Sequence, residues 1–241
     1  MKIQLIGHDE NYAVEQSLLA FFPQERPVYE GEDALTATVT LSGEGSVYAA
    51  ATVIAGAAQT AEGNDQVDVT GVENEYERER LLQRAVKLSF FKAARNFTGV
   101  TPAWGALTGI RPAKLVSGII RQGNTPDETD EILQNTYFVS PERRRLAIQC
   151  AQAGIAAQED LTKKDISIYV GIPFCPTRCA YCSFVSNSVE KSFHLVEPYL
   201  EALFKEIDSA AEMVEELGLN VKSFYMGGGT PTTLTAEQMD R

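Results

Sequence analysis

A short loop, CPTRCAYC, constrains this chain more than any other stretch, because it holds three of the four cysteines. Cys175, Cys179 and Cys182 are separated by three and then by two residues. The stretch before the loop, ISIYVGI, is rich in β-branched and aromatic residues and predicts a strand. In a reducing compartment, thiols gathered so closely indicate metal or redox chemistry, and not a disulfide framework.

The amino terminus and the overall charge narrow the class of protein. The stretch MKIQLIGHDENYAVEQ lacks the charged start, the long apolar core and the cleavage site of a signal peptide. No apolar run approaches the roughly 18–20 residues that span a bilayer, so we expect a cytoplasmic protein without a membrane span. The formal net charge of −12 opposes the counterion release on which nucleic-acid binding depends. The basic run from Arg143 to Arg145 is the exception, and we expect it to be the solvated face of a helix.

The first 162 residues predict an accessory domain that is α+β at first and then helical. Its predicted elements follow in the order strand, helix, strand, strand, helix. They lie at KIQLIG, YAVEQSLLAFF, ALTATVTL, SVYAAATVI and a long helix from about residue 73 to 97. From residue 102 to 158 we expect short-looped helices, with Pro112 and Pro141 in first turns. Cys150 lies inside the last of these helices, where a lone cysteine is usually a small buried hydrophobe.

A change of pattern near Lys163 separates this accessory domain, residues 1–162, from a second domain, residues 163–241. The second domain predicts a strand at 166–172, the cysteine loop, a helix at 196–217, a strand at 223–226 and a glycine-rich turn. A parallel β-α-β crossover is the economical interpretation, and the fold class is then α/β. Thr235 and Gln238 have the spacing of a capping box, which begins a further helix. Since so few elements cannot cover both faces of a parallel sheet, we expect an N-terminal portion of a longer protein.

Four interpretations compete for the three clustered cysteines. A structural zinc site needs a fourth ligand, and neither Cys150 nor His194 has a suitable spacing to the loop. A thiol-redox loop around CAYC leaves Cys175 without a role. Chance clustering is the third interpretation. An iron–sulfur cluster is the fourth, and three thiolates would leave one iron open to a ligand from outside the protein.

The spacing C-x3-C-x2-C after a strand, with an aromatic residue before the last cysteine, closely resembles the radical S-adenosylmethionine (SAM) superfamily. The resemblance implies that Cys175, Cys179 and Cys182 bind three irons of a [4Fe–4S] cluster. The amino and carboxylate groups of SAM would chelate the fourth iron, and the reduced cluster would cleave SAM to a 5′-deoxyadenosyl radical. The resemblance also implies that residues 163–241 are the first βα units of a partial (β/α)6 barrel.

A second motif, FYMGGGTPT, follows the predicted strand at 223–226. Its glycines let the backbone approach a ligand, and N–H groups at such a turn favour an anion. It resembles the glycine motif of the superfamily, which contacts the methionyl group of SAM. The resemblance implies SAM contacts at Gly228, Gly229 and Thr230, with Gly227 adjoining. Tyr169 would line the SAM site and Tyr181 would touch its adenine side, although each tyrosine alone is by default a core aromatic.

The stretches YVGIPFC, CAYCSF and GGGTPT resemble the oxygen-independent coproporphyrinogen III oxidase family. The N-terminal domain and LTGIRPAKL, residues 107–115, make the HemZ-type coproporphyrinogen dehydrogenase branch the most similar. The resemblance implies oxidative decarboxylation of two propionates to vinyl groups, giving protoporphyrinogen IX for haem biosynthesis. A flavodoxin or ferredoxin would supply electrons. Arg178 and Arg111 are candidate partners for the propionates, although a structural or solvated role is the simpler interpretation for both.

Two departures from the family pattern keep a second function open. The best-studied branch has a fourth cysteine where this chain has Ser183 and Phe184, and a histidine where it has Gly171. A relative that also lacks the fourth cysteine is a haem chaperone, so the alternative is a protein that binds haem without oxidase activity. We expect the 241-residue chain alone not to convert porphyrinogen.

Overall fold

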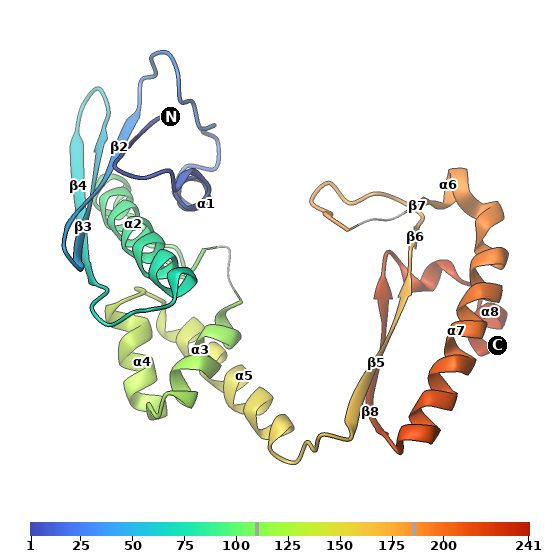
Figure 1. Cartoon of the computed structure of the whole chain (residues 1–241). Helices are drawn as coiled ribbons and strands as arrows, with labels where there is room; N and C mark the ends of the chain where they lie inside the picture. Colours follow the sequence, from blue (N-terminus) through green and yellow to red (C-terminus); the bar gives the residue numbers. More distant parts are fainter. Residues whose placement is uncertain (109–110, 185–186) are drawn as a thin grey trace. The chain divides into compact units, whose positions relative to one another are not determined.

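The computed structural model describes residues 1–108, 111–184 and 187–241 (Figure 1). Of the LTGIRPAKL stretch, Gly109 and Ile110 lie outside the described residues. The chain divides into two compact units, Met1–Ala156 and Ala157–Arg241. Within the described residues, no helix combines the length and the apolar character needed to cross a membrane.

The first unit is built on a four-stranded sheet in the order β1-β2-β3-β4. Strand β1 is parallel to β2, and the other two pairings are antiparallel. Two helices share the core of the sheet through buried residues such as Leu18 of α1 and Phe90 of α2. The bounds of these elements are β1 Lys2–Ile6, α1 Asn11–Phe21, β2 Thr36–Glu44, β3 Val47–Ala55, β4 Thr60–Asp68 and α2 Glu75–Thr98.

Strand β4 is absent from the order predicted by the sequence, and that prediction is wrong at this point. Its sequence, TAEGNDQVD, is polar because β4 is an edge strand that turns alternate residues to water. Gly63 lies under α2, where an added Cβ would stand 2.2 Å from the backbone oxygen of Ser89. The glycine that weakens the strand pattern is therefore what lets the helix pack closely on the sheet.

Three further helices complete the first unit, and each begins at a proline, which suits a first turn. They are α3 Pro112–Arg121, α4 Pro126–Asn135 and α5 Pro141–Glu159. Val116, Leu133 and Ala147 are buried between them. Cys150 is exposed and not buried as expected, because it lies beside the buried stripe of α5, formed by Ala147, Ile148 and Ala151, and not within it.

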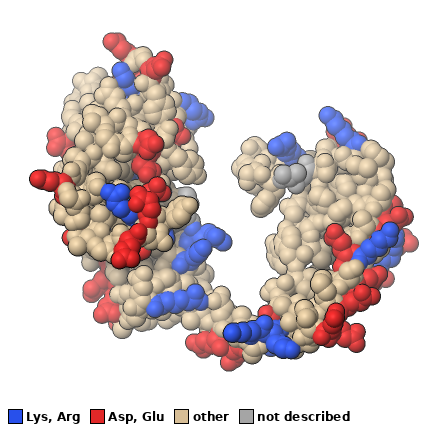
Figure 2. All heavy atoms as spheres, in the orientation of Figure 1, with Lys and Arg blue, Asp and Glu red and all other residues tan. Residues whose placement is uncertain are grey.

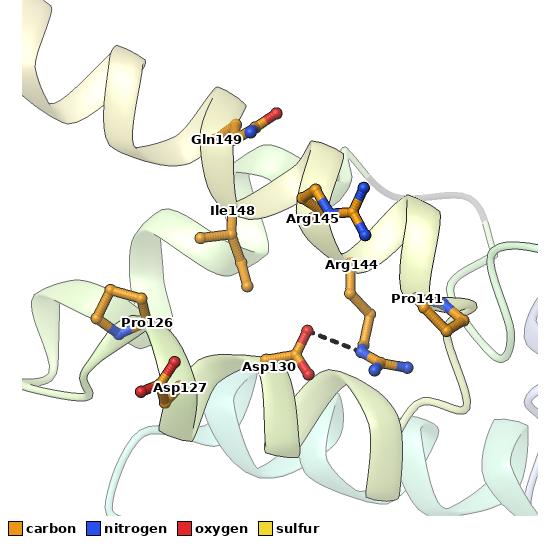
Figure 3. Close-up of a pocket in the computed structure, with 8 residues that line it drawn as sticks. All are labelled: Pro126, Asp127, Asp130, Pro141, Arg144, Arg145, Ile148 and Gln149. Atoms are coloured by element: carbon orange, nitrogen blue, oxygen red, sulfur yellow. Dashed lines mark hydrogen bonds and ion pairs between the residues drawn. The ribbon is translucent and has the colours of Figure 1, made fainter.

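The basic run at the start of α5 is only partly a solvated face. Arg144 donates from Nε to Asp130 Oδ1 at 2.8 Å and from Nη1 to the oxygen of Val139 at 2.9 Å. Figure 3 shows this pair across a shallow pocket between α4 and α5, with Arg145 beside it. Arg143 lies over the ring of Trp104. Arg144 is thus a structural residue, whereas Arg145 is exposed as predicted.

The second unit is a parallel β-α-β crossover, as predicted. Strand β5, Asp165–Ile172, pairs with β8, Asn220–Gly228, and α7, Val196–Leu217, connects them. The apolar face of α7 packs on one side of these strands, and acidic side chains predominate on its outer side (Figure 2). The short elements are β6 Phe174–Cys175, β7 Asn187–Ser188, α6 Val189–Ser192, η1 Phe193–Leu195, η2 Pro231–Thr233 and α8 Ala236–Asp240.

The predicted fold class is confirmed in both units. The first is a small α+β unit with added helices, and the second has the parallel strands and crossover helix with which a (β/α) barrel begins. Thr235 and Gln238 form the predicted capping box at the start of α8.

Candidate functional site

The face of β5 and β8 opposite α7 presents pairs of like residues in register. Ser167 faces Ser223, Tyr169 faces Tyr225, and Gly171 faces Gly227. Successive side chains of a strand alternate between faces, so these pairs share one side of the sheet. The two tyrosine rings stack with centroids 5.8 Å apart and expose 61% and 67% of their surfaces. This open aromatic face therefore leads along both strands toward the glycine motif.

The glycine motif is hydrogen-bonded to the chain that enters the cysteine loop. The N–H of Gly229 donates to the oxygen of Ile172, and the N–H of Thr230 donates to the oxygen of Phe174, both at 2.8 Å. A Cβ on Gly229 would lie 2.7 Å from the Phe174 oxygen and 2.8 Å from Cys175 Sγ. Only glycine leaves room for this approach, so the motif and the first cysteine form one site.

Thr230 of the motif and Thr233, directly after the motif, direct their hydroxyl groups to the same segment. Thr230 Oγ1 donates to Cys175 Sγ at 3.5 Å, and Thr233 Oγ1 donates to the oxygen of Phe174 at 3.3 Å. Gly228 has a φ of +96°, which a residue with a side chain rarely adopts. The turn after β8 is thus shaped by its glycine and held by its threonines.

Cys179 and Cys182 lie farther along the loop, in a turn closed by the N–H of Cys182 and the oxygen of Cys179 at 3.1 Å. Cys179 is exposed and Cys182 is half-buried. Tyr181 is 90% exposed. A hydrogen bond to the sulfur of Cys179, together with the thiolate charge there, raises the pKa of Tyr181 above its ordinary value. Tyr181 is therefore a surface residue of the cysteine loop and not a core aromatic.

The donor set fits an iron–sulfur cluster in its chemistry. All four cysteines are free of disulfide bonds. Three thiolates suit iron or zinc, and one of the three, Cys175, lies against Gly229. Within the described residues, no three His, Cys, Asp or Glu side chains are gathered as a metal site. Cys179 and Cys182 would therefore have to approach Cys175 when a cluster binds. The same finding gives no support to Cys150 or His194 as a fourth ligand for zinc.

The structure brings most of the predicted residues of the second unit to one end of the sheet. Gly229 and Thr230 adjoin Cys175, Gly228 lies against Ile172, and Tyr169 lies on the open face beside Gly171 and Gly227. Arg178 is exposed in the cysteine loop. Arg111 belongs to the first unit, directly before α3.

Sequence reasoning missed two tyrosines of this end of the sheet. Tyr225 stacks on Tyr169, and its position two residues before Gly227 is the signal that would have placed it on the open face. Tyr199 of α7 donates its hydroxyl to the oxygen of Gly171 and packs edge-on against Phe174. Burial, followed by the charge of Glu206, raises the pKa of Tyr199. Tyr199 therefore holds the end of β5 as a neutral phenol.

Comparison with known proteins identifies relatives by sequence alone. No protein-family model and no solved structure matches the chain. The chain is 35% identical over 168 residues to the oxygen-independent coproporphyrinogen-III oxidase-like protein HemZ of Bacillus subtilis, covering 69% of this chain and 34% of HemZ. It is 36% identical over 90 residues to the oxygen-independent coproporphyrinogen III oxidase of Escherichia coli, covering 37% of this chain and 19% of the oxidase.

A third relative carries a different name. The chain is 36% identical over 76 residues to the heme chaperone HemW of Buchnera aphidicola, covering 32% of this chain and 19% of HemW. The chain thus spans about a third of the length of HemZ and about a fifth of the other two relatives. An oxidase and a chaperone share these similarities, so they establish a family and not one activity. Together these relatives support placing the chain in the radical SAM coproporphyrinogen oxidase family.

Proposed function

We propose that this chain is a radical SAM oxidoreductase of haem biosynthesis, which decarboxylates two propionates of coproporphyrinogen III oxidatively and without oxygen. The product is protoporphyrinogen IX. One observation carries the proposal: the glycine motif after β8 is hydrogen-bonded to Phe174 and contacts Cys175. The two motifs of the superfamily therefore meet at the carboxyl ends of parallel strands, where α/β folds bind their ligands.

The residues of this chain have separate tasks in the proposed site. When bound, a [4Fe–4S] cluster with SAM supplies the one-electron chemistry. Cys175, Cys179 and Cys182 hold the cluster and leave one iron position open. The backbone of Gly228 and Gly229 would contact the methionyl part of SAM, because the missing Cβ atoms let this turn lie close to Ile172 and Cys175. Tyr169, stacked on Tyr225, offers a flat apolar surface that a bound ligand would shield from water.

The proposed substrate carries negative charge, and the proposed reductant is a separate protein. Propionates are anionic and bind to guanidinium groups through paired hydrogen bonds, which Arg178 in the exposed cysteine loop is free to offer. The acidic chain, with a net charge of −12, requires such a local positive group to bind an anionic porphyrinogen. A cytoplasmic flavodoxin or ferredoxin is the proposed electron donor.

Anaerobic reconstitution tests the proposal. Iron, sulfide and EPR spectra are measured with and without SAM for the native chain, Cys175→Ser and Cys150→Ser. We expect a reduced [4Fe–4S] signal that changes with SAM in the native chain and in Cys150→Ser, since Cys150 is exposed on α5. Cys175→Ser should lose the cluster. Zinc in place of iron, or a cluster indifferent to SAM, would return the loop to a structural role.

A haem chaperone is the second candidate function, and the similarity to HemW favours it. Titration of the chain with haem separates the two candidates, with porphyrinogen consumption measured on the same preparation. Tight stoichiometric haem binding without loss of porphyrinogen would favour the chaperone. Weak haem binding beside SAM-dependent cluster chemistry would favour the oxidoreductase.

A further inference from the structure

The hydroxyl group of Thr230 has a partner that the SAM-contact role does not explain. Thr230 Oγ1 donates to Cys175 Sγ at 3.5 Å, while the N–H of the same residue donates to Phe174 at 2.8 Å. A hydroxyl group has one proton to donate and two lone pairs. Since the proton is directed at sulfur, the side chain can only accept from a ligand at this site. Its contact with SAM would then be to the ammonium group and not to the carboxylate.

Cys175 differs from the other two loop cysteines in its surroundings. Cys175 is half-buried, as is Cys182, but Gly229 lies so close to Cys175 that an added Cβ would be 2.8 Å from its sulfur. Cys179 is exposed, and Tyr181, two residues along the loop, is itself 90% exposed. Of these three thiols, Cys175 is therefore the one that the turn after β8 holds in place.

We propose that Thr230 is a positioning residue whose hydrogen bond fixes Cys175 and raises the reduction potential of the cluster that Cys175 holds. The inference rests on the proposed function. Reduction adds negative charge to the iron and sulfur atoms, so a hydrogen-bond donor stabilises the reduced form more than the oxidised form. Hydrogen bonds to the ligating sulfurs are among the factors that set such potentials.

The experiment is a redox titration of the reconstituted chain without SAM, followed by EPR. Native protein is compared with Thr230→Val, which removes the hydroxyl and keeps the shape, and with Thr230→Ser, which keeps the hydroxyl. Thr233→Val is the matched control, because Thr233 donates to the backbone of Phe174 and not to sulfur. We expect Thr230→Val to lower the equilibrium constant for one-electron reduction about tenfold, a shift of about 59 mV. Thr230→Ser and Thr233→Val should keep the native potential.

The outcomes separate this inference from the proposed function. If the native chain holds no iron and sulfide, the proposed function fails and the inference fails with it. If the native chain holds a cluster and Thr230→Val keeps its potential, or Thr233→Val shifts it equally, the inference alone is overturned. If Thr230→Val assembles no cluster, the Thr230→Ser variant tests the role of the hydroxyl group. Retention of the cluster in Thr230→Ser and in Thr233→Val supports that role. Loss of the cluster in Thr230→Ser refutes it.

Discussion

Replacement of Gly229 by alanine is the sharpest test of the contact between the glycine motif and the cysteine loop. The new Cβ would stand 2.7 Å from the oxygen of Phe174, 2.8 Å from Cys175 Sγ and 3.1 Å from the oxygen of Ile172. Ordinary contacts of carbon are about 3.5–4.0 Å, so the closest neighbours must move by about 0.7 Å or more. Two of the three are backbone oxygens, which cannot rotate away as a side chain can.

Overpacking of this kind costs about 1–3 kcal/mol. The cost falls on the hydrogen bonds that join the turn after β8 to β5 and β6. We therefore expect amide exchange in peptides covering residues 166–175 and 223–234 to quicken about 5- to 150-fold in Gly229→Ala, because each 1.4 kcal/mol is a factor of about ten. Hydrogen–deuterium exchange followed by mass spectrometry measures this directly, and the iron content after reconstitution should fall in parallel.

Gly118→Ala is the matched control. Nothing lies within 4 Å of a Cβ added at this helical position, so the substitution should leave exchange unchanged in both peptides of the second unit. Native exchange rates in Gly229→Ala would refute the close contact between the motif and Cys175.

Three further predictions test other parts of the structure. The backbone N–H of Thr162, and after it the side chain of Asn220, donates a hydrogen bond to Asp165 and holds the pKa of this carboxyl below its ordinary value. The ionised carboxylate therefore stabilises the fold near neutral pH, and this stabilisation is lost as the pH falls below about 4. Asp165→Asn should remove this acid-dependent loss, seen as a smaller difference between urea midpoints at pH 6 and pH 3. Arg144→Ala should destabilise the first unit by about 1–2 kcal/mol in urea unfolding, because it leaves the oxygen of Val139 unpaired, whereas exposed Arg145→Ala should stay within about 0.5 kcal/mol. Tyr225→Ala should weaken SAM binding about two- to tenfold in calorimetry, while Tyr225→Phe, which keeps the stacked ring, should bind as the native chain does.

Much of the local structure was predictable because its signals are local. The apolar periodicity and the change to β-branched residues placed α7 and β5 close to their observed bounds, and Thr235 with Gln238 marked the start of α8. The spacing of Cys175, Cys179 and Cys182 identified the candidate cluster loop without any contact information. Each of these signals lies within a short stretch of the chain. Over such a stretch, the side-chain period and hydrogen bonds between sequence neighbours determine the local structure.

The sequence predictions were wrong where the surroundings of a residue depend on a partner that is distant in the sequence. Strand β4 is polar because it is an edge strand, and its Gly63 is there because α2 packs directly against it. Arg144 is held partly buried against the protein because Asp130, fourteen residues earlier, faces it across α4 and α5. Cys150 is exposed because the packing of α5 buries only the narrow stripe of Ala147, Ile148 and Ala151 beside it.

By itself, the sequence determined most of the longer elements of this protein, though not β4, and it determined the cysteine loop and the glycine motif. Only the tertiary structure decided that Thr230 and Gly229 contact Cys175, that Tyr225 stacks on Tyr169, and that both tyrosines share the face opposite α7. Such contacts join residues up to 56 positions apart, and the parallel register of β5 and β8 creates them. Periodicity assigns each residue to a face of its own strand, but it does not by itself show which residue of β8 lies beside which residue of β5; that alignment depends on the packing of α7 against both strands.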